Sequence, residues 1–454
     1  MNYPDESVIL ESGGNRSIPD DKDQIPKPDE EQPEEKKYSF LQETIKPKPI
    51  SRQQLVRQLV RIAIYGVILG AFACLGFFAL KPWVQDIFRG NLETVTIPED
   101  EDPAEDDSQE TSDTDGAEET SESGQSVTAD SYEQMMASMN ERAAEAEKGI
   151  VSVEAATDQT DWDAEMTGIG RSVTGIITAD NGQELLILAD SSICEDVSEW
   201  NVVFEDGKSC SASLKMRDLN TGLAMFSVPR GNIADSTWDA VKVSVLGNSN
   251  LVKQGDVVMA LGNMFGYPGG MSYGIISSTG YKTTFYDGDC DVMTTDIVSE
   301  SEGTGVLFNM DGEVIGLISP SVWKDSGTNI VNAYAVSDLK AVIEIMANGE
   351  SVPYIGIYGT TVTTELQEDQ GMPAGVYVVD VDPDSPAMEA GIQSGDVICQ
   401  VGDEKVSSIV TYQSAVLETK TGRQILIRGM RLGADGYVEV RFTVTVGSKE
   451  TKTK

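Results

Sequence analysis

The sequence predicts a mainly β protein that one helix holds at a membrane. Short β-rich runs alternate with Gly, Asp and Asn turns through residues 150–345, a pattern typical of an all-β barrel or sandwich. An uncharged apolar run at residues 62–80 is long enough to cross a bilayer as a single transmembrane helix. Between them, residues 93–130 are acidic and almost free of apolar side chains, which predicts a disordered, extended stalk.

The charges around the apolar run predict its orientation. Arg52, Arg57 and Arg61 precede it, whereas acidic sequence follows soon after Lys81 and Arg89. Because positive charge stays on the cytoplasmic side, we expect a cytoplasmic N-terminus, a single-pass anchor in the cell membrane and an extracytoplasmic bulk. A cleaved signal peptide does not fit, since the preceding polar region is too long and no A-x-A site follows.

The composition excludes several classes of function. The 454 residues carry 33 Lys and Arg against 75 Asp and Glu, a formal net charge of −42. Such a field repels nucleic acid and anionic lipid headgroups, so neither is a predicted ligand. The chain has no histidine, which removes the usual general base and a common metal ligand. We therefore predict no cofactor and no metal.

Cysteine usage leaves two alternatives open. Of the five cysteines, Cys74 lies in the apolar run and the other four lie in the extracytoplasmic part. Four cysteines allow two disulfides in three pairings, or they remain as separate buried thiols. The four are Cys194, Cys210, Cys290 and Cys399.

Residues 296–319, DIVSESEGTGVLFNMDGEVIGLIS, combine a Gly-containing loop with a hairpin whose turn is Asp311-Gly312. This stretch resembles the nucleophile loop of trypsin-like serine proteases of the HtrA/Deg family. Residues 246–280, LGNSNLVKQGDVVMALGNMFGYPGGMSYGIISSTG, resemble a further block of that family that spans several strands. The resemblance implies a trypsin-like double β-barrel in residues 148–347.

The positions that match the family's catalytic triad carry other residues. The serine position falls at Gly303 when counted from the downstream turn, or at Thr304 when counted from upstream, while Ser192 and Gly222 match the histidine and the aspartate. A threonine hydroxyl needs an activating base, and the neighbouring Glu302 carboxylate would repel a developing oxyanion. We therefore predict a pseudoprotease that is not an enzyme and has no catalytic residue.

Residues 351–447 form a second predicted domain. Their run SPAMEAGIQSGDVI resembles a PDZ domain of the HtrA kind. Four residues match the family's carboxylate-binding loop, whose backbone N–H groups hold a peptide terminus while the peptide adds to the sheet edge. They are Tyr354, Ile355, Gly356 and Ile357. Apolar side chains on a later helix, Val416 or Leu417, are expected to line the pocket for the peptide's terminal side chain.

Two other candidate sites are weak in the sequence. Asp287, Asp289 and Asp291 give the D-x-D-x-D start of a calcium loop, but Val292 and Val298 replace the required Gly and Glu. An acidic hairpin tip fits better. Cys290 lies among these carboxylates, which raise a thiol's pKa, so we expect a poor nucleophile.

The predicted organisation has five parts: a disordered cytoplasmic tail (1–50), the anchor (51–90), the acidic stalk with a short helix (91–147), the protease-fold domain (148–347) and the PDZ domain (351–447). The helix-forming stretch at residues 131–147 is expected to pack on the following domain or on a partner chain. Family members often form trimers, so the resemblance implies a homotrimer as one arrangement.

Three functions fit these features. The favoured prediction is a membrane-anchored scaffold or regulator that binds C-terminal, extended or unfolded segments of envelope or secreted proteins through its PDZ domain, without cleavage. The alternative, implied by the family resemblance alone, is an active HtrA-type endopeptidase in envelope protein quality control. The third is a mechanical surface spacer with a vestigial PDZ loop.

Overall fold

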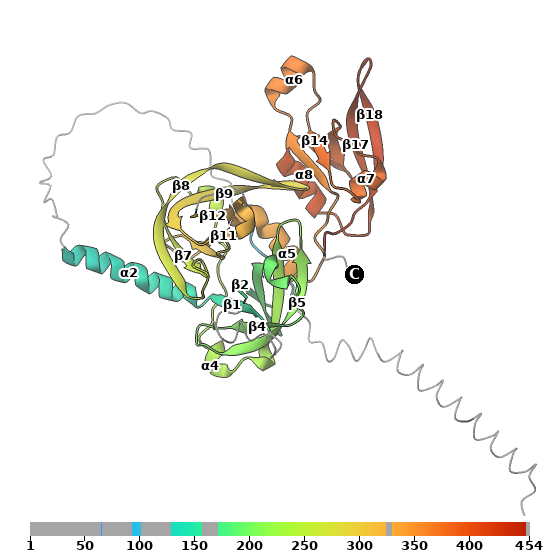
Figure 1. Cartoon of the computed structure of the whole chain (residues 1–454). Coiled ribbons are helices and arrows are strands. Elements are labelled where there is room, and N and C mark those ends of the chain that lie inside the picture. Colours follow the sequence, from blue (N-terminus) through green and yellow to red (C-terminus); the bar gives the residue numbers. More distant parts are fainter. Residues whose placement is uncertain (1–64, 66–92, 101–128, 157–170, 324–328, 451–454) are drawn as a thin grey trace, which may run out of the picture. The chain divides into compact units, whose positions relative to one another are not determined.

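The computed structural model describes residues 65, 93–100, 129–156, 171–323 and 329–450 (Figure 1). Helix α2 (Ala129–Glu147) occupies the stretch with helix-forming composition. Its Ala143 is fully buried in the core of the second barrel described below, and its Asn140 accepts a hydrogen bond from the Tyr273 hydroxyl at 2.8 Å. The helix therefore packs on the domain that follows it.

Six antiparallel strands close the first barrel in the order β1-β2-β3-β6-β5-β4. They are β1 (Ile150–Ala155), β2 (Ser172–Asp180), β3 (Glu184–Asp190), β4 (Trp200–Val203), β5 (Ser209–Asp218) and β6 (Leu223–Pro229). Strands β2, β3 and β6 are buried along almost their whole length. Ile177 and Phe226 point into this barrel's core, whereas Ile176 and Met225 join the core of the second barrel. Burial on both faces explains why these strands are almost continuously apolar in sequence.

The second barrel closes in the order β10-β11-β12-β9-β8-β7. Its strands are β7 (Val257–Gly262), β8 (Gly270–Phe285), β9 (Gly288–Val298), β10 (Gly305–Phe308), β11 (Val314–Ile318) and β12 (Ile330–Ala335). Long strands β8 and β9 are joined by a loop of only two residues, Tyr286 and Asp287, between the paired residues Phe285 and Gly288. We call Tyr286–Asp289 the β8–β9 tip; it lies far along the hairpin from the barrel wall formed by β7.

The C-terminal domain is a sheet in the order β13-β14-β15-β17-β18, with β16 paired to β15. Its strands are β13 (Ile357–Thr361), β14 (Val376–Val381), β15 (Val397–Val401), β16 (Glu404–Lys405), β17 (Gln424–Gly433) and β18 (Gly436–Thr445). Helices α6 (Thr364–Gln370), α7 (Pro386–Ala390) and α8 (Ile409–Leu417) complete the domain. Strand β13 is at an edge of the sheet, and a separate core that includes Tyr412 and Phe442 stabilises the domain.

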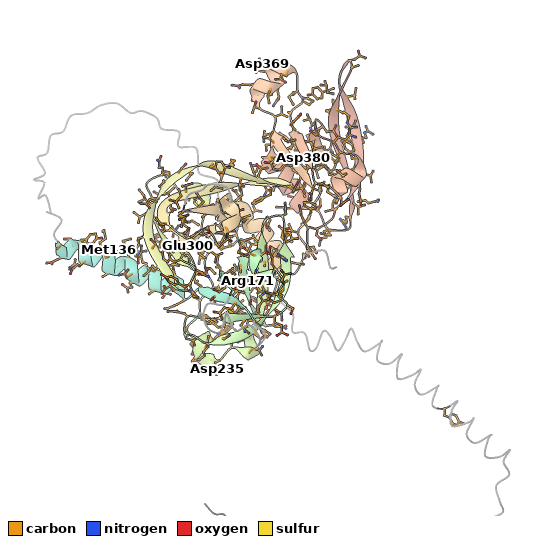
Figure 2. The ribbon with its side chains drawn as sticks, in the orientation of Figure 1. Met136, Arg171, Asp235, Glu300, Asp369 and Asp380 are labelled. Atoms are coloured by element: carbon orange, nitrogen blue, oxygen red, sulfur yellow. The ribbon has the colours of Figure 1, made fainter. Side chains whose placement is uncertain are left out.

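Short elements connect these units. They are η1 (Ser191–Cys194), η2 (Arg230–Asn232), α4 (Asp235–Trp238), η3 (Ser249–Leu251), η4 (Pro320–Trp323), η5 (Val336–Leu339) and α5 (Lys340–Ala347). Both barrels and the C-terminal domain belong to one compact unit, Trp83–Lys454. Figure 2 shows the side chains of this unit, with Arg171 just before β2 and Glu300 in the loop before β10.

The mainly β double barrel predicted from the sequence is confirmed. The predicted transmembrane run at residues 62–80 lies, except for Tyr65, outside the described residues, as do the cytoplasmic tail and most of the stalk. Among the described residues, no helix combines the length and apolar composition that crossing a bilayer requires. The four described cysteines, at 194, 210, 290 and 399, are free thiols.

Candidate functional site

The structure brings two of the triad-equivalent positions together. Ser192 lies on η1, directly after β3, and Gly222 ends the turn between β5 and β6. The backbone N–H of Ser191 donates to the Gly222 carbonyl at 2.8 Å. Gly222 has a φ of 76°, and a Cβ built there would lie 3.4 Å from the Ser321 hydroxyl. The position matched to the family's aspartate is therefore a turn glycine that faces a serine.

The third position, Gly303 or Thr304, is built for packing between the barrels. A Cβ at Gly303 would lie 2.5 Å from the Met264 carbonyl oxygen, so a side chain does not fit there without a shift. Thr304 is only 3% exposed. Its hydroxyl accepts the backbone N–H of Thr174 at 2.8 Å, and the Thr174 hydroxyl donates back to the Thr304 carbonyl at 2.9 Å. These bonds join the loop before β10 to β2 of the first barrel.

A carboxylate that the sequence reasoning missed lies beside these positions. One Asp190 carboxylate oxygen accepts the N–H of Ser192 at 2.9 Å, and the other accepts the hydroxyl of Ser319. Ser319 lies 2.7 Å from the Ser321 hydroxyl, which in turn lies 3.1 Å from the Tyr334 hydroxyl. Burial raises the pKa of Tyr334 to about 12, so this phenol stays protonated at neutral pH. The result is a chain from a carboxylate through two serine hydroxyls to a phenol.

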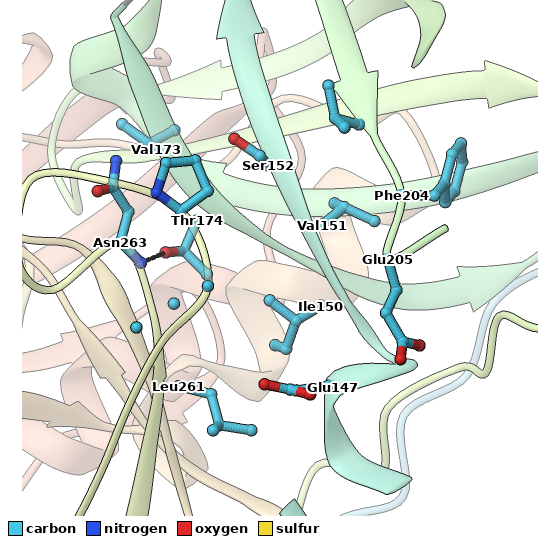
Figure 3. Close-up of a pocket in the computed structure, with 15 residues that line it drawn as sticks. Glu147, Ile150, Val151, Ser152, Val173, Thr174, Phe204, Glu205, Leu261 and Asn263 are labelled. Atoms are coloured by element: carbon cyan, nitrogen blue, oxygen red, sulfur yellow. Dashed lines mark hydrogen bonds between the residues drawn. The ribbon is translucent and has the colours of Figure 1, made fainter. Parts of the chain in front are cut away.

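Two cavities lie near the Gly303–Thr304 loop, one lined by Gly303 and the other by Thr174, which is hydrogen-bonded to Thr304. One, of about 50 Å³, is lined by Gly303, Ser319 and Asn332 among others, which leaves room for one or two water molecules. The other, of about 340 Å³, lies beside Thr174 and Asn263 (Figure 3). Figure 3 also shows the bond that the Asn263 backbone N–H donates to the Thr174 hydroxyl, at 2.7 Å. The larger cavity is lined by residues of both barrels, whereas the smaller one is lined by residues of the second barrel.

The predicted carboxylate-binding loop holds a carboxylate, and that carboxylate is Asp287 from the β8–β9 tip. The backbone N–H groups of Ile355 and Gly356 donate to Asp287 Oδ2 at 2.6 and 2.7 Å. The N–H of Ile357 donates to Asp287 Oδ1 at 2.9 Å, and the Tyr412 hydroxyl donates to the same oxygen at 2.7 Å. Two of these donors therefore converge on each carboxylate oxygen.

The geometry of the loop depends on a glycine. Gly356 has a φ of 94°, which is unfavourable for other residues, and a Cβ there would lie 2.4 Å from the Ser385 Cβ. Close packing against Ser385 and a left-handed backbone are what allow three consecutive N–H groups to face one point. The sequence-predicted residues Ile355, Gly356 and Ile357 thus act through their backbone.

Tyr354 lies next to the loop and contacts a second carboxylate. Its hydroxyl donates to Asp382, and Lys449 Nζ lies 2.8 Å from the same carboxylate. Burial raises the pKa of Tyr354, and the bond to Asp382 raises it further, so the phenol remains a donor. Although burial raises the pKa of Asp382, the hydrogen bonds from Lys449 and Tyr354 outweigh it, and the pKa is lowered overall.

Burial and hydrogen bonding act in opposite directions on the buried Asp287–Tyr412 pair. Burial raises the pKa of the Asp287 carboxyl, while the three backbone N–H groups and the Tyr412 hydroxyl oppose that rise by stabilising the anion. Burial and the neighbouring Asp287 charge together raise the pKa of Tyr412 well above its ordinary value. Tyr412 is therefore a protonated donor at neutral pH.

Helix α8 contributes Tyr412 to the carboxylate-binding loop, a residue that was not predicted from the sequence. Val416 is buried in the core of the C-terminal domain, and Leu417 packs against the core of the second barrel. Tyr412, one turn before Val416, is the α8 residue that reaches the carboxylate. The available signal was its position on the same helix face, four residues before Val416.

The three aspartates at the β8–β9 tip do not converge on a common point. Asp287 enters the loop, whereas Asp291 pairs with Lys282 at 2.6 Å. Within the described residues, no group of three or more Cys, Asp or Glu side chains is placed to hold a metal ion. Cys290 is fully buried, and burial followed by the Asp338 charge raises its pKa well above the ordinary thiol value, which disfavours the thiolate.

Two protein-family models match the folded part of the chain. A trypsin-like peptidase domain matches residues 173–317, and a PDZ domain matches residues 353–442. The predicted PDZ domain is therefore confirmed. Together the matches agree with the closed double barrel and with the six-stranded C-terminal sheet.

Curated proteins named as periplasmic serine proteases are similar to this chain. A probable periplasmic serine endoprotease, DegP-like, of Halomonas elongata is 29% identical over 280 residues, which cover 60% of this chain and 56% of that protein. A probable periplasmic serine protease, do/HhoA-like, of Haemophilus influenzae is 27% identical over 283 residues, covering 61% and 58%. The chain thus spans little more than half the length of these relatives.

A solved structure titled "HtrA-type protease AlgW with tripeptide" is 24% identical, with a TM-score of 0.49 and coverage of 68% of this chain and 96% of that one.

The comparisons contradict the prediction that the chain is not an enzyme, because its similar curated proteins are named as serine endoproteases. That prediction rested on the triad-equivalent residues, the neighbouring Glu302 and the absence of histidine from the sequence. It did not take into account the hydrogen bond between Asp190 and Ser319, two residues that are 129 positions apart in sequence. The fold places this pair beside Ser192.

Proposed function

From its HtrA/DegP-type pairing of a trypsin-like peptidase domain with a PDZ domain, we propose that this chain binds the C-terminal or extended segments of other extracytoplasmic proteins. The observation that carries the proposal is the convergence of three consecutive backbone N–H groups, at residues 355–357, on one carboxylate. The binding site is the Ile355–Ile357 loop together with the neighbouring edge strand β13.

The loop has the chemistry that a peptide terminus requires. A terminal carboxylate presents the same two oxygens as the Asp287 side chain, so Asp287 stands in for it. Backbone N–H groups around a glycine form an anion-binding concavity without a cationic side chain. In this loop two N–H groups donate hydrogen bonds to one oxygen. A third N–H and the Tyr412 hydroxyl donate to the other oxygen. Recognition of this kind is expected to select a carboxylate and to tolerate varied peptide sequences.

Strand β13 offers the main-chain partner for a bound segment. It pairs with β14 along one side only and lies at the end of the sheet. Its Ile357 carbonyl already accepts an N–H from outside the domain, that of Asp287, at 2.7 Å. This bond is the first that an added strand would make beside an occupied carboxylate loop. A peptide is therefore expected to extend along β13.

Two features support an extracytoplasmic, membrane-anchored setting. The similar proteins of Halomonas elongata and Haemophilus influenzae are named as periplasmic. The apolar run at residues 62–80 has positive charge before it and acidic sequence after it, which favours export of the part that follows. In this setting the ligands are envelope or secreted proteins, and a homotrimer would present three loops at one place on the membrane.

The test of the proposal compares one decapeptide with a free C-terminal carboxylate and the same decapeptide as a C-terminal amide. Fluorescence polarisation with the full-length chain is expected to give tighter binding of the free acid, by at least about tenfold, since the amide lacks the anion. Gly356→Ala is expected to remove this preference, because its Cβ would contact Ser385.

Gly402→Ala is the matched control, since Gly402 also has a positive φ, of 57°, but open space around it. The control is expected to keep the preference. Equal binding of acid and amide both by the unmodified chain and by Asp287→Gly, whose loop lacks the occupying carboxylate, would contradict the proposal.

The names of the relatives favour a second candidate, peptide-bond hydrolysis at the junction of the barrels. Here the Ser319 hydroxyl would attack the carbonyl while the Asp190 carboxylate takes its proton, since these two groups are already hydrogen-bonded. Asp190 would then pass that proton to the leaving amine as the C–N bond breaks, and water would hydrolyse the acyl-enzyme ester to release the acid and restore the Ser319 hydroxyl. Without an imidazole the rate is expected to be low. Casein turnover that disappears in both Ser319→Ala and Asp190→Asn, but persists in the exposed-loop control Ser301→Ala, would support it. Turnover that persists in both variants would exclude it.

A further inference from the structure

We propose that the β8–β9 tip is a built-in ligand of the PDZ domain, so that Asp287 and an incoming peptide carboxylate compete for the same loop. This inference rests on the proposed function and adds its regulation. It is carried by the contacts of Asp287, which is 6% exposed and comes from the second barrel rather than from the PDZ domain.

Asp287 uses all the donors that the loop aims at a carboxylate. Ile355 and Gly356 donate to one oxygen, and Ile357 with Tyr412 donates to the other. A backbone N–H has one hydrogen to donate, so the same group cannot hold a second carboxylate at full strength. An external terminus therefore binds only after Asp287 leaves.

The tip also occupies the place where a bound strand would run. The Asp287 N–H donates to the Ile357 carbonyl on β13 at 2.7 Å. On the opposite side, the Asp289 N–H donates to the Gln413 side chain of α8 at 3.3 Å, and a Cβ on Gly288 would lie 2.6 Å from Gln413 Cδ. Since the tip contacts both β13 and α8, it occupies the position beside these two elements where a strand added to β13 would begin.

The turn chemistry places a carboxylate at this point. Asp287 has a φ of 63°, a left-handed conformation at the second residue of the two-residue loop that favours Gly or Asn, with Asp next. A glycine there would satisfy the turn but would supply no acceptor for the PDZ loop. The aspartate adopts the backbone conformation that the turn needs, and its carboxylate also accepts the hydrogen bonds of the PDZ loop.

The tip is also joined to the first barrel. The Asn220 side chain donates to the Tyr286 carbonyl at 2.7 Å and accepts the Tyr286 N–H at 3.2 Å. Asn220 lies in the same β5–β6 turn as Gly222, one of the triad-equivalent positions. Release of Asp287 by a peptide would therefore free a tip that contacts the junction between the barrels.

The first test measures occupancy without any ligand. Hydrogen exchange of the Ile355–Ile357 amides is followed in the full-length chain and in two variants, Asp287→Gly, which keeps the turn, and Asp287→Asn, which keeps the shape. Both are expected to exchange at least about tenfold faster at these amides, because the acceptor of all three is lost or replaced by a neutral amide. Asp289→Asn, two residues along, removes the same charge and is expected to leave exchange unchanged.

The second test adds the free-acid and amide forms of the decapeptide. Asp287→Gly is expected to bind the free acid at least about tenfold more tightly than the unmodified chain, because the loop is then open in most molecules. The amide should not gain. Equal affinity of the unmodified chain and Asp287→Gly for the free acid, together with unchanged exchange, would overturn the built-in ligand.

The outcomes separate the two proposals. If both proteins prefer the free acid to the same extent, the binding function stands and the built-in ligand fails. If exchange rises in Asp287→Gly but no protein distinguishes acid from amide, the built-in ligand stands and the binding function fails.

Discussion

The junction of the barrels and the PDZ loop are both sites where the sequence predicts chemistry, but they differ in which atoms would perform it. Catalysis by a trypsin-like fold depends on side chains, and the positions predicted to match its catalytic residues are Ser192, Gly222 and either Gly303 or Thr304. Binding at the PDZ loop depends on backbone N–H groups, which any residue supplies once Gly356 sets the conformation. The junction is therefore defined by which side chains the fold brings together, and the loop by where its backbone N–H groups point.

This difference teaches how far a resemblance can be carried. At a site that works through side chains, a similar arrangement of strands does not indicate activity until each functional group is located. At a backbone site, the glycine and its packing are the functional features. The close approach of Gly356 to Ser385 is thus stronger evidence for a site than the intact strands around Thr304.

The largest expected change in the free energy of unfolding is at the PDZ loop. Among the residues that the structure describes, Tyr412 is the only side-chain donor to the buried Asp287 carboxylate. Tyr412→Phe removes this donor, and a hydrogen bond to a charged group contributes about 1.5–3 kcal/mol. The free energy of unfolding, from urea denaturation, is expected to fall by about that amount. The three amides should still be protected from exchange, since their own bonds remain.

Tyr437→Phe on β18, where the hydroxyl is partly exposed, is the control and is expected to change the free energy of unfolding by less than about 0.5 kcal/mol. A loss of amide protection in Tyr412→Phe would show that the backbone alone does not hold the carboxylate.

A smaller effect is expected at the junction of the barrels. Thr304→Val keeps the shape but removes the acceptor of the Thr174 N–H, a buried bond whose loss costs about 1–2 kcal/mol. Thr304→Ser, which keeps the hydroxyl, is expected to lose less. If the two variants unfold at the same urea concentration, the Thr304 hydroxyl does not stabilise the contact between the barrels. Side-chain hydrogen bonding at the junction would then be excluded as the basis of the comparison.

The smallest effect concerns pH. The pKa of Asp382 is lowered overall in the folded chain, so its ionised form stabilises the fold above the unfolded pKa, and that stability is lost as pH falls through the folded pKa. Between pH 7 and pH 3, the unmodified chain is expected to lose more stability than Asp382→Asn, by less than about 1 kcal/mol since the pair is partly exposed. Parallel pH profiles of the two proteins would contradict this assignment.

Much of the fold was predictable because its signals are local. The hairpin around Asp311-Gly312 and the apolar runs that became β2, β3 and β6 are readable within a few residues. The PDZ loop was predictable for the same reason, since Tyr354–Ile357 are consecutive. Each of these features forms from neighbours in sequence.

The contacts that the sequence did not reveal join distant segments. Asp190 and Ser319 are 129 residues apart, and Asp287 lies 68 to 70 residues from the amides that it accepts. From sequence, Asp287 belonged to an acidic hairpin tip. Only the register of β8 with β9 and the packing of α8 bring it to the loop. The same applies to Tyr412, whose role depends on a carboxylate from another domain.

The most direct measurement of the central claim is the ratio of two dissociation constants, for the acid and the amide of a single decapeptide, on the Asp287→Gly protein. With the competing side chain removed, the account predicts that the acid binds at least about tenfold more tightly than the amide. A ratio of one would contradict the account, because the three amides would then have no preference for a carboxylate.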